Sequence, residues 1–263
     1  EARAPTAIIN KLGKGKAIFL NTAVNDYAQV TLGGVGGELS EVKKGALEIN
    51  EQVKGFARDI FKLGNLVPEV LIKTNTGVDF QSVTKTSIWK NGQINYVGFL
   101  YEPENMYSKI RPEEVTEVNI LFKEKGHLYD VKKKKYLGLI SGDKEIKTKL
   151  TPAVAGIFSI LPYKVERLEA KSDKTSYKAG EVVKLSVSVK TSKGQAGNHT
   201  TYLEVEGPDK KIRDYYSQKV ILQKGKGNIE IPIAFNDATG LWVVSLRDVA
   251  SGVSRKLNVR VTN

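Results

Sequence analysis

The chain of 263 residues contains no cysteine. It therefore cannot form a disulfide, a thiolate zinc site, an iron–sulfur cluster or a cysteine nucleophile. Its only histidines are His127 and His199, so one chain cannot supply an all-histidine metal site. No apolar run approaches the roughly 20 residues of a membrane-spanning helix. We expect no metal site, no cofactor and no transmembrane segment.

The beginning of the chain has no recognisable targeting segment. It starts Glu1-Ala2-Arg3, without an initiator methionine, and no apolar run follows a basic start. We therefore expect a processed chain or a fragment of a longer protein, and the organisation of the N-terminal region favours the fragment.

The net charge of +12 is spread over the second and third parts of the chain. Residues 1–70 carry a net +1, residues 71–165 carry +5 and residues 166–263 carry +6. The only dense basic run is Lys132-Lys133-Lys134-Lys135, between two strand-like segments. Nucleic-acid binding would need basic residues interleaved with exposed aromatic residues, so we expect a solvated hairpin turn. A positive field can still attract an anionic surface or a polysaccharide.

The first part of the chain predicts one strand and one helix. The apolar run Ala17-Ile18-Phe19-Leu20 follows a glycine turn and predicts a buried strand at about 17–21. Apolar residues at spacings of three and four predict a helix at about 45–63, with Gly64 as its C-terminal cap. These elements are too few to complete an α/β layer. Residues 1–70 are therefore expected to be the remnant of an α/β domain.

The rest of the chain predicts two β-sandwich domains in tandem. Residues 71–165 contain about eight short strand patterns, and Asn91-Gly92 predicts a type I′ hairpin turn. Residues 166–263 contain about seven strand patterns, which fits an immunoglobulin-like sandwich with Trp242 in its core. Within this module, Ser176 to Glu181 predicts a turn, and Ile212 to Leu222 predicts a strand. The expected fold class is mainly β.

Several segments together resemble the C-terminal region of large extracytoplasmic proteins related to β-galactosidases. Gly13 to Asn21 resembles the last strand of their glutamine-amidotransferase-like, or trimerisation, domain, and residues 45–70 fit the helix that closes it. Four segments resemble the β domain that follows in these proteins: Tyr129-Asp130-Val131, Lys135 to Gly138, Leu150-Thr151-Pro152 and Ile160 to Tyr163. Five further segments resemble a terminal immunoglobulin- or macroglobulin-like module: Gly207-Pro208-Asp209, Tyr215-Tyr216, Ile231 to Ala234, Asn236-Asp237 and Gly240-Leu241-Trp242.

The resemblance implies an accessory region and not a catalytic one, because the catalytic barrel of this family lies outside the chain. No phosphate-binding loop and no Gly-x-Ser-x-Gly motif is present. A glycosidase needs two carboxylates across its substrate, and the sequence singles out no pair among its 29 acidic residues. We expect no catalytic residues in this chain, although the parent protein resembles a glycoside hydrolase. An enzyme complete within these residues is kept as a third hypothesis.

Aromatic side chains are the candidates for carbohydrate contact, because flat rings stack on sugar faces. The candidates are Trp89 and Tyr101 beside the Asn91-Gly92 hairpin, and Tyr215 in the last module. Alternation in a strand places Phe99 and Tyr101 on one face and Tyr96 on the other. Of the adjacent Tyr215 and Tyr216, at most one is expected to be exposed. Core packing is the alternative explanation for every one of these rings.

Two functions remain open from the sequence. The first is a noncatalytic accessory or scaffold region of an extracytoplasmic glycoside-hydrolase-like protein, which provides spacing, oligomer contacts or carbohydrate contact. The second is a structural cell-surface subunit, such as an envelope layer or a filament. Both place the chain outside the cell, on the cell surface or in the periplasm. The expected partners are other domains of a parent chain or identical subunits, with polysaccharide as a further contact and no nucleic acid.

Overall fold

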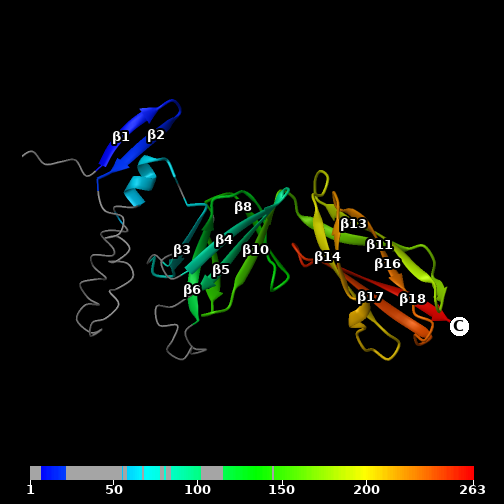
Figure 1. Ribbon diagram of the computed structural model, residues 1–263. Coiled ribbons are helices and arrows are strands. Elements are labelled where there is room, and N and C mark those ends of the chain that lie inside the picture. The colour runs from blue at the N-terminus through cyan, green and yellow to red at the C-terminus, as the bar shows by residue number, and fades with distance from the viewer. Residues whose placement is uncertain are drawn as a thin grey trace, which may run out of the picture. The chain divides into compact units, whose positions relative to one another are not determined.

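The structure is a computed structural model that describes most of the chain (Figure 1). The described residues are 7–21, 55, 58–66, 68–77, 80, 84–101, 115–143 and 145–263. They are mainly β-strands, which confirms the predicted fold class. The chain divides into two compact units at residue 68, and each unit is considered separately below.

The N-terminal unit contains a β-hairpin where the sequence predicted a single strand. Strand β1 (Ala7–Leu12) pairs antiparallel with β2 (Gly15–Leu20). Gly13 in the connecting turn has φ +57°, a conformation that glycine adopts without strain. The prediction of a buried strand was wrong, because Phe19 is 62% exposed. Pairing with β1 satisfies the backbone of β2 without covering its side chains.

The end of the predicted helix is confirmed at residue 63, although its cap differs. Residues 58–63 are helical, whereas residues 45–54, 56 and 57 of the prediction lie outside the described residues. The backbone N–H of Leu66 donates to Phe61 O at 2.9 Å, and that of Asn65 donates to Lys62 O at 2.9 Å. These bonds form a Schellman motif, whose left-handed position is taken by Asn65 (φ +58°) and not by Gly64.

The second unit begins with a sandwich of a three-stranded and a five-stranded antiparallel sheet, here called the first sandwich. The smaller sheet has the order β3-β6-β9, and the larger has the order β4-β5-β10-β7-β8. The strands of the smaller sheet are β3 (Val70–Thr74), β6 (Thr116–Phe122) and β9 (Glu145–Leu150). Those of the larger sheet are β4 (Thr84–Asn91), β5 (Ile94–Tyr101), β7 (Gly126–Asp130), β8 (Lys135–Ile140) and β10 (Gly156–Leu161).

Alternate residues of these strands fill the core between the two sheets. Phe99, Phe122 and Phe158 meet there with ring centroids 5.7–6.2 Å apart. Each of the three is at most 2% exposed. Every such ring removes a large apolar area from water, so this cluster stabilises the first sandwich.

The β4–β5 hairpin forms as expected, but its turn is displaced by one residue. Asn91 pairs with Ile94, so the two turn residues are Gly92 and Gln93. Only Gly92 has a positive φ (+59°), which fits a type II′ turn with glycine first and not the predicted type I′ turn. The hairpin places Trp89 directly opposite Tyr96.

The second sandwich again combines three and five strands. Its sheets have the orders β11-β13-β16 and β12-β18-β17-β14-β15. The strands of the smaller sheet are β11 (Val165–Ser172), β13 (Val182–Thr191) and β16 (Lys226–Pro232). Those of the larger sheet are β12 (Ser176–Lys178), β14 (His199–Glu206), β15 (Gln218–Leu222), β17 (Gly240–Asp248) and β18 (Ser254–Thr262). Trp242 is 1% exposed, which confirms its predicted place in the core.

Two predicted segments of the second sandwich differ from the structure. Residues 176–178 form strand β12, which pairs in parallel with β18, and the turn follows at Gly180 (φ +86°). The predicted strand Ile212 to Leu222 is interrupted by a 3₁₀ helix, η2 (Asp214–Tyr216), so that only its second half is strand β15. Tyr216 in η2 is buried, and its ring lies 6.1 Å from that of Trp242. The packing of this ring against the core stabilises the 3₁₀ turn in place of an extended strand.

Candidate functional site

One row of side chains crosses all five strands of the larger sheet of the first sandwich, on the face opposite the phenylalanine core. In strand order the row is Trp89, Tyr96, Ser159, Tyr129 and Tyr136. Tyr129 and Ser159 in the middle of the row are at most 1% exposed, whereas Trp89 at one edge is 53% exposed. The second sandwich covers the middle of the row and leaves Trp89 open.

Hydrogen bonds attach the second sandwich to this row. Ser159 Oγ donates to Ala250 O at 2.5 Å, and Val165 N donates to the Tyr129 hydroxyl at 2.8 Å. Ile94 and Leu161 from the same sheet face join the hydrophobic core of the second sandwich. The two sandwiches therefore share a junction whose centre is buried and holds both polar and apolar contacts.

A buried polar network lies on the second-sandwich side of this junction. Asp248 accepts hydrogen bonds from Ser251 N at 2.8 Å and from Ser251 Oγ at 2.5 Å, and its other oxygen lies 2.7 Å from His199 Nδ1. His199 Nε2 lies 3.0 Å from the Tyr163 hydroxyl, which accepts Gly197 N–H at 2.6 Å. Both His199 and Asp248 are fully buried.

This network contains serine, histidine and aspartate without the geometry of a catalytic triad. In a triad the serine hydroxyl is bonded to the histidine, whereas here Ser251 donates to Asp248. The other ring nitrogen of His199 is occupied by Tyr163. Because every member has its partner inside the fold, the network connects the loop at residues 248–251 with the segments at residues 163 and 197–199 and serves the structure.

Burial also raises the pKa of two tyrosines of the junction, Tyr96 and Tyr129. Desolvation, with the Asp248 charge as a smaller contribution, raises the pKa of Tyr96 to about 12. Desolvation likewise raises the pKa of Tyr129 to about 12, opposed by its hydrogen bond from Val165. Both hydroxyls therefore keep their protons well above the pH at which a solvent-exposed tyrosine loses its own.

The structure places the three predicted carbohydrate-contact residues apart from one another. Trp89 lies on the outer sheet face against Gly98, where an added Cβ would be 2.8 Å from the indole ring. Tyr101 lies on the inner face, its ring centroid 4.9 Å from that of Phe80. Tyr215, which is 69% exposed, belongs to η2 of the second sandwich. The three cannot form one platform, and Trp89 alone presents an open indole face beside a rigid sheet.

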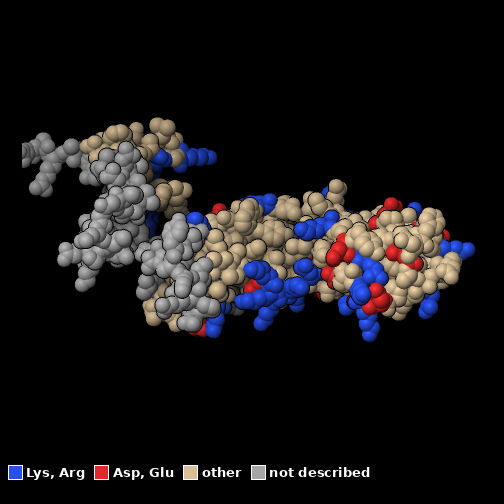
Figure 2. All heavy atoms as spheres, turned by 60° about the horizontal axis from the view of Figure 1, so that its bottom comes forward, with Lys and Arg blue, Asp and Glu red and all other residues tan. Residues whose placement is uncertain are grey.

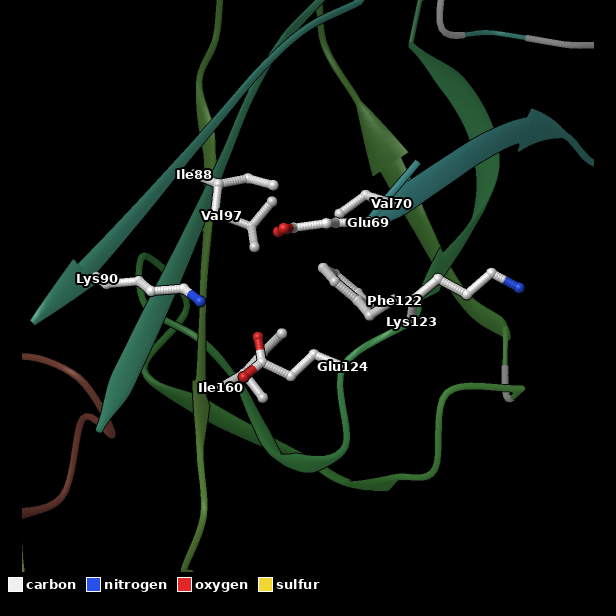
Figure 3. Close-up of a pocket in the computed structure, with 9 residues that line it drawn as sticks. All are labelled: Glu69, Val70, Ile88, Lys90, Val97, Phe122, Lys123, Glu124 and Ile160. Atoms are coloured by element: carbon white, nitrogen blue, oxygen red, sulfur yellow. The ribbon is translucent and has the colours of Figure 1, made fainter. Parts of the chain in front are cut away.

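A cavity of about 260 Å³ opens at one end of the first sandwich (Figure 3). Figure 3 shows the Glu69 and Glu124 side chains on opposite sides of this space, with Lys90 reaching in from a third side. Antiparallel pairing explains the placement, because Lys123 N donates to Glu69 O at 2.9 Å and Glu124 is the next residue. The apolar residues that line the cavity are Val70, Ile88, Val97, Phe122 and Ile160.

The two glutamates were not singled out by the sequence, because only the β3–β6 pairing brings them together. Both carboxylates are exposed to solvent, whereas the acid of a glycosidase is shielded from water so that it keeps its proton. Asn95 Nδ2 donates to Glu124 Oε1, which fixes that side chain at the rim. The arrangement is an open end of the sandwich core with a charged rim.

Two further kinds of feature concern the described residues, clusters of metal-binding side chains and membrane-spanning helices. Among these residues, no group of three or more histidine, aspartate or glutamate side chains could hold a metal ion. None of the described helical residues belongs to a helix long and apolar enough to cross a bilayer. The carboxylate of Asp237 is engaged within the fold, since it accepts hydrogen bonds from the Tyr216 hydroxyl and from Ala234 N.

No protein-family model matches the chain, and no curated protein matches it in sequence. Solved structures that resemble it include a glycosyl hydrolase family 2 member from Bacteroides cellulosilyticus, with 13% identity and a TM-score of 0.30 over 55% of this chain and 24% of that one. The adhesin InvE of Yersinia pseudotuberculosis has 10% identity and a TM-score of 0.31, with 69% and 59% of the two chains covered.

The native form of the Escherichia coli α2-macroglobulin is another similar structure, with 14% identity and a TM-score of 0.33. The match covers 65% of this chain and 14% of the macroglobulin. The chain thus spans about a quarter of the family 2 hydrolase and less than two thirds of the adhesin.

Proposed function

We propose that this chain is a noncatalytic accessory and scaffold region of a larger extracytoplasmic, glycoside-hydrolase-like protein. In this proposal residues 71–165 and 166–263 are two sandwich domains that hold other parts of the parent chain, or identical subunits, at a fixed spacing. Residues 1–70 are the remnant of an α/β domain. The chain acts outside the cell, at the cell surface or in the periplasm.

The observation that carries this proposal is the sealed junction between the sandwiches. A flexible linker would leave both ends free, whereas here Ser159 and Tyr129 bond across the contact. A spacer needs such a fixed angle, because it must transmit position from one partner to the next.

Electron spin labels test the spacer role directly. Because the chain has no cysteine, Lys125→Cys and Glu230→Cys in the full chain can be labelled selectively, one on each sandwich. We expect one narrow distribution of distances between the labels, unchanged between low and high salt. A broad distribution would show that the sandwiches move independently and would contradict a spacer of fixed geometry.

The noncatalytic part has its own test at the charged cavity rim. The full chain is expected to leave nitrophenyl galactosides unhydrolysed. Turnover that disappears in Glu124→Gln but survives in the control Glu117→Gln would contradict this part of the proposal.

Trp89 supplies the carbohydrate contact of this proposal. Its indole has one face on Gly98 and is 53% exposed, so a sugar ring can stack on the open face. We expect Trp89→Ala to weaken retention of the chain on insoluble galactan about tenfold, in line with the loss of about 1–2 kcal/mol of apolar contact. The fraction of chain bound in a pulldown at increasing amounts of galactan measures the change.

The control for Trp89 is Tyr215→Ala, which removes another exposed ring from the second sandwich and is expected to leave retention unchanged. Both variants should unfold at nearly the native temperature. Equal retention of Trp89→Ala and the native chain would remove carbohydrate contact from the proposal and leave the scaffold.

A structural cell-surface subunit remains the second candidate, and exposed apolar residues on two edge strands favour it. Leu139 on β8 is 60% exposed and Ile221 on β15 is 65% exposed, and each strand ends its sheet. Exposed edges can pair between subunits. Regular arrays in electron micrographs of the purified chain would support this function, and discrete particles would support the accessory region.

A further inference from the structure

A groove lined by lysines runs along the first sandwich, between the edge strands β8 and β9 of its two sheets. Its larger part is a cavity of about 550 Å³, and a second cavity of about 230 Å³ continues it. The two cavities share Lys133 and Lys149. Figure 2 shows basic side chains gathered in one group on the first sandwich. The lysines that line the groove are Lys132, Lys133, Lys135, Lys147 and Lys149.

The acidic side chains of the groove neutralise only part of this charge. Lys149 Nζ lies 3.3 Å from Glu117 Oε1, and Lys133 Nζ lies 3.5 Å from Asp130 Oδ2. Among the described residues, Lys135 and Lys147 form no ion pair. Glu117 and Asp130 are the only acidic residues that line the two cavities in the described part of the chain, so the groove keeps a net positive charge.

The lysines of the β7–β8 turn are held in place by the fold. The buried Asp130 accepts Lys133 N–H at 2.8 Å, which closes the turn, and Lys132 Nζ donates to Ala155 O at 3.0 Å. The second sandwich packs against the turn so closely that a Cβ at Gly252 would be 2.7 Å from Lys134 Cα. The backbone that carries Lys132 and Lys133 is therefore fixed before a ligand arrives, which lowers the entropy lost when a ligand binds.

We propose that this groove binds a strand of acidic polysaccharide, with Lys135 and Lys147 pairing with its carboxylates. Lys147 and Lys149 lie on one face of β9, about 7 Å apart as alternate strand residues are. A linear polymer can follow such a row of cations. The proposal goes beyond the accessory function, since it holds whether or not the parent protein is related to glycoside hydrolases.

The neutral residues of the groove favour a sugar polymer over nucleic acid. Asn75, Asn119 and Thr148 also line the larger cavity, and their amides and hydroxyl can bond sugar hydroxyl groups. Single-stranded nucleic acid is instead held by stacking of its bases on aromatic rings. Neither cavity has tyrosine or tryptophan among its described lining residues, and the one aromatic residue is the buried core residue Phe158.

The test compares two double variants of the full chain that have the same net charge. Lys135→Gln/Lys147→Gln removes two cations from the groove, and Lys219→Gln/Lys256→Gln removes two exposed lysines from the second sandwich. The probe is polygalacturonate, with neutral dextran and single-stranded polydeoxythymidine as comparison polymers. Calorimetry or affinity electrophoresis is performed from 50 to 300 mM salt.

The groove variant is expected to bind polygalacturonate about tenfold more weakly than the native chain and with a shallower dependence on salt, while the control double variant binds like the native chain. Dextran should not bind at this site. Equal losses in both double variants would reduce the effect to diffuse net charge and overturn the proposal. So would tighter binding of polydeoxythymidine than of polygalacturonate, or no binding of polygalacturonate at 50 mM salt.

Discussion

Replacing Asp248 with alanine is expected to lower the free energy of unfolding by about 3–5 kcal/mol, because several buried polar groups lose their partner at once. The variant leaves His199 Nδ1 and both Ser251 donors without their acceptor in a site that water does not reach. Urea titration of the full chain, followed by tryptophan fluorescence, measures the change. Trp242 in the same sandwich reports its unfolding.

The matched control is Asp209→Ala in the second sandwich. Asp209 also accepts hydrogen bonds, from Arg213 and Lys211, but it lies at the surface, where water replaces lost partners. Its substitution should therefore cost far less than that of Asp248. If the two variants unfolded at the same urea concentration, the buried network would not stabilise the second sandwich as described.

The second large effect is expected for Gly252→Ala. Gly252 has φ +76°, where a side chain costs about 1–2 kcal/mol. The new Cβ would also lie 2.7 Å from Lys134 Cα, and relieving that overlap costs about 1–3 kcal/mol more. We expect the second sandwich to move away from the β7–β8 turn, so that the distance distribution between labels at positions 125 and 230 broadens.

Gly194→Ala separates these two contributions. Gly194 has a similar φ of +67°, but nothing lies within 4 Å of the position where its Cβ would be. This variant should lose only the stability that a side chain at positive φ costs, and it should keep the narrow distance distribution. Broadening in Gly194→Ala, or an unchanged distribution in Gly252→Ala, would show that the close approach to Lys134 does not hold the sandwiches together.

The strands themselves could be predicted from the sequence because their side chains alternate. In strand β9 the side chains of Ile146, Thr148 and Leu150 are more buried than those of Glu145, Lys147 and Lys149. The alternation of apolar and polar residues from Val183 to Val189 is the clearest case, because its apolar residues are the buried ones of strand β13. Short or interrupted strands were missed. A strand of three residues, such as β12, is too short for its side chains to show an alternating pattern.

The sites depended on sheet order, which no local pattern contains. His199 and Asp248 are 49 residues apart and meet because β14 pairs with β17. The row that ends at Trp89 exists only because β10 lies between β5 and β7. By contrast, the opposite faces of Tyr96 and Tyr101 follow from parity within one strand. The one-residue displacement of the hairpin turn left that parity intact and changed only which residues lie opposite each other.

The parallel pairing of β12 with β18 sets an order for synthesis on the ribosome. Ser176 lies opposite Arg260, so β12 emerges long before the strand it pairs with has been translated. β18 also lies between β12 and β17 in its sheet. Until residues 254–262 arrive, Tyr177 of β12 has no neighbouring strand to shelter it, and a nascent chain would expose it to chaperones or to other nascent chains. Closing of this sheet is therefore a late step in the folding of the second sandwich, even though most of its strands are available earlier.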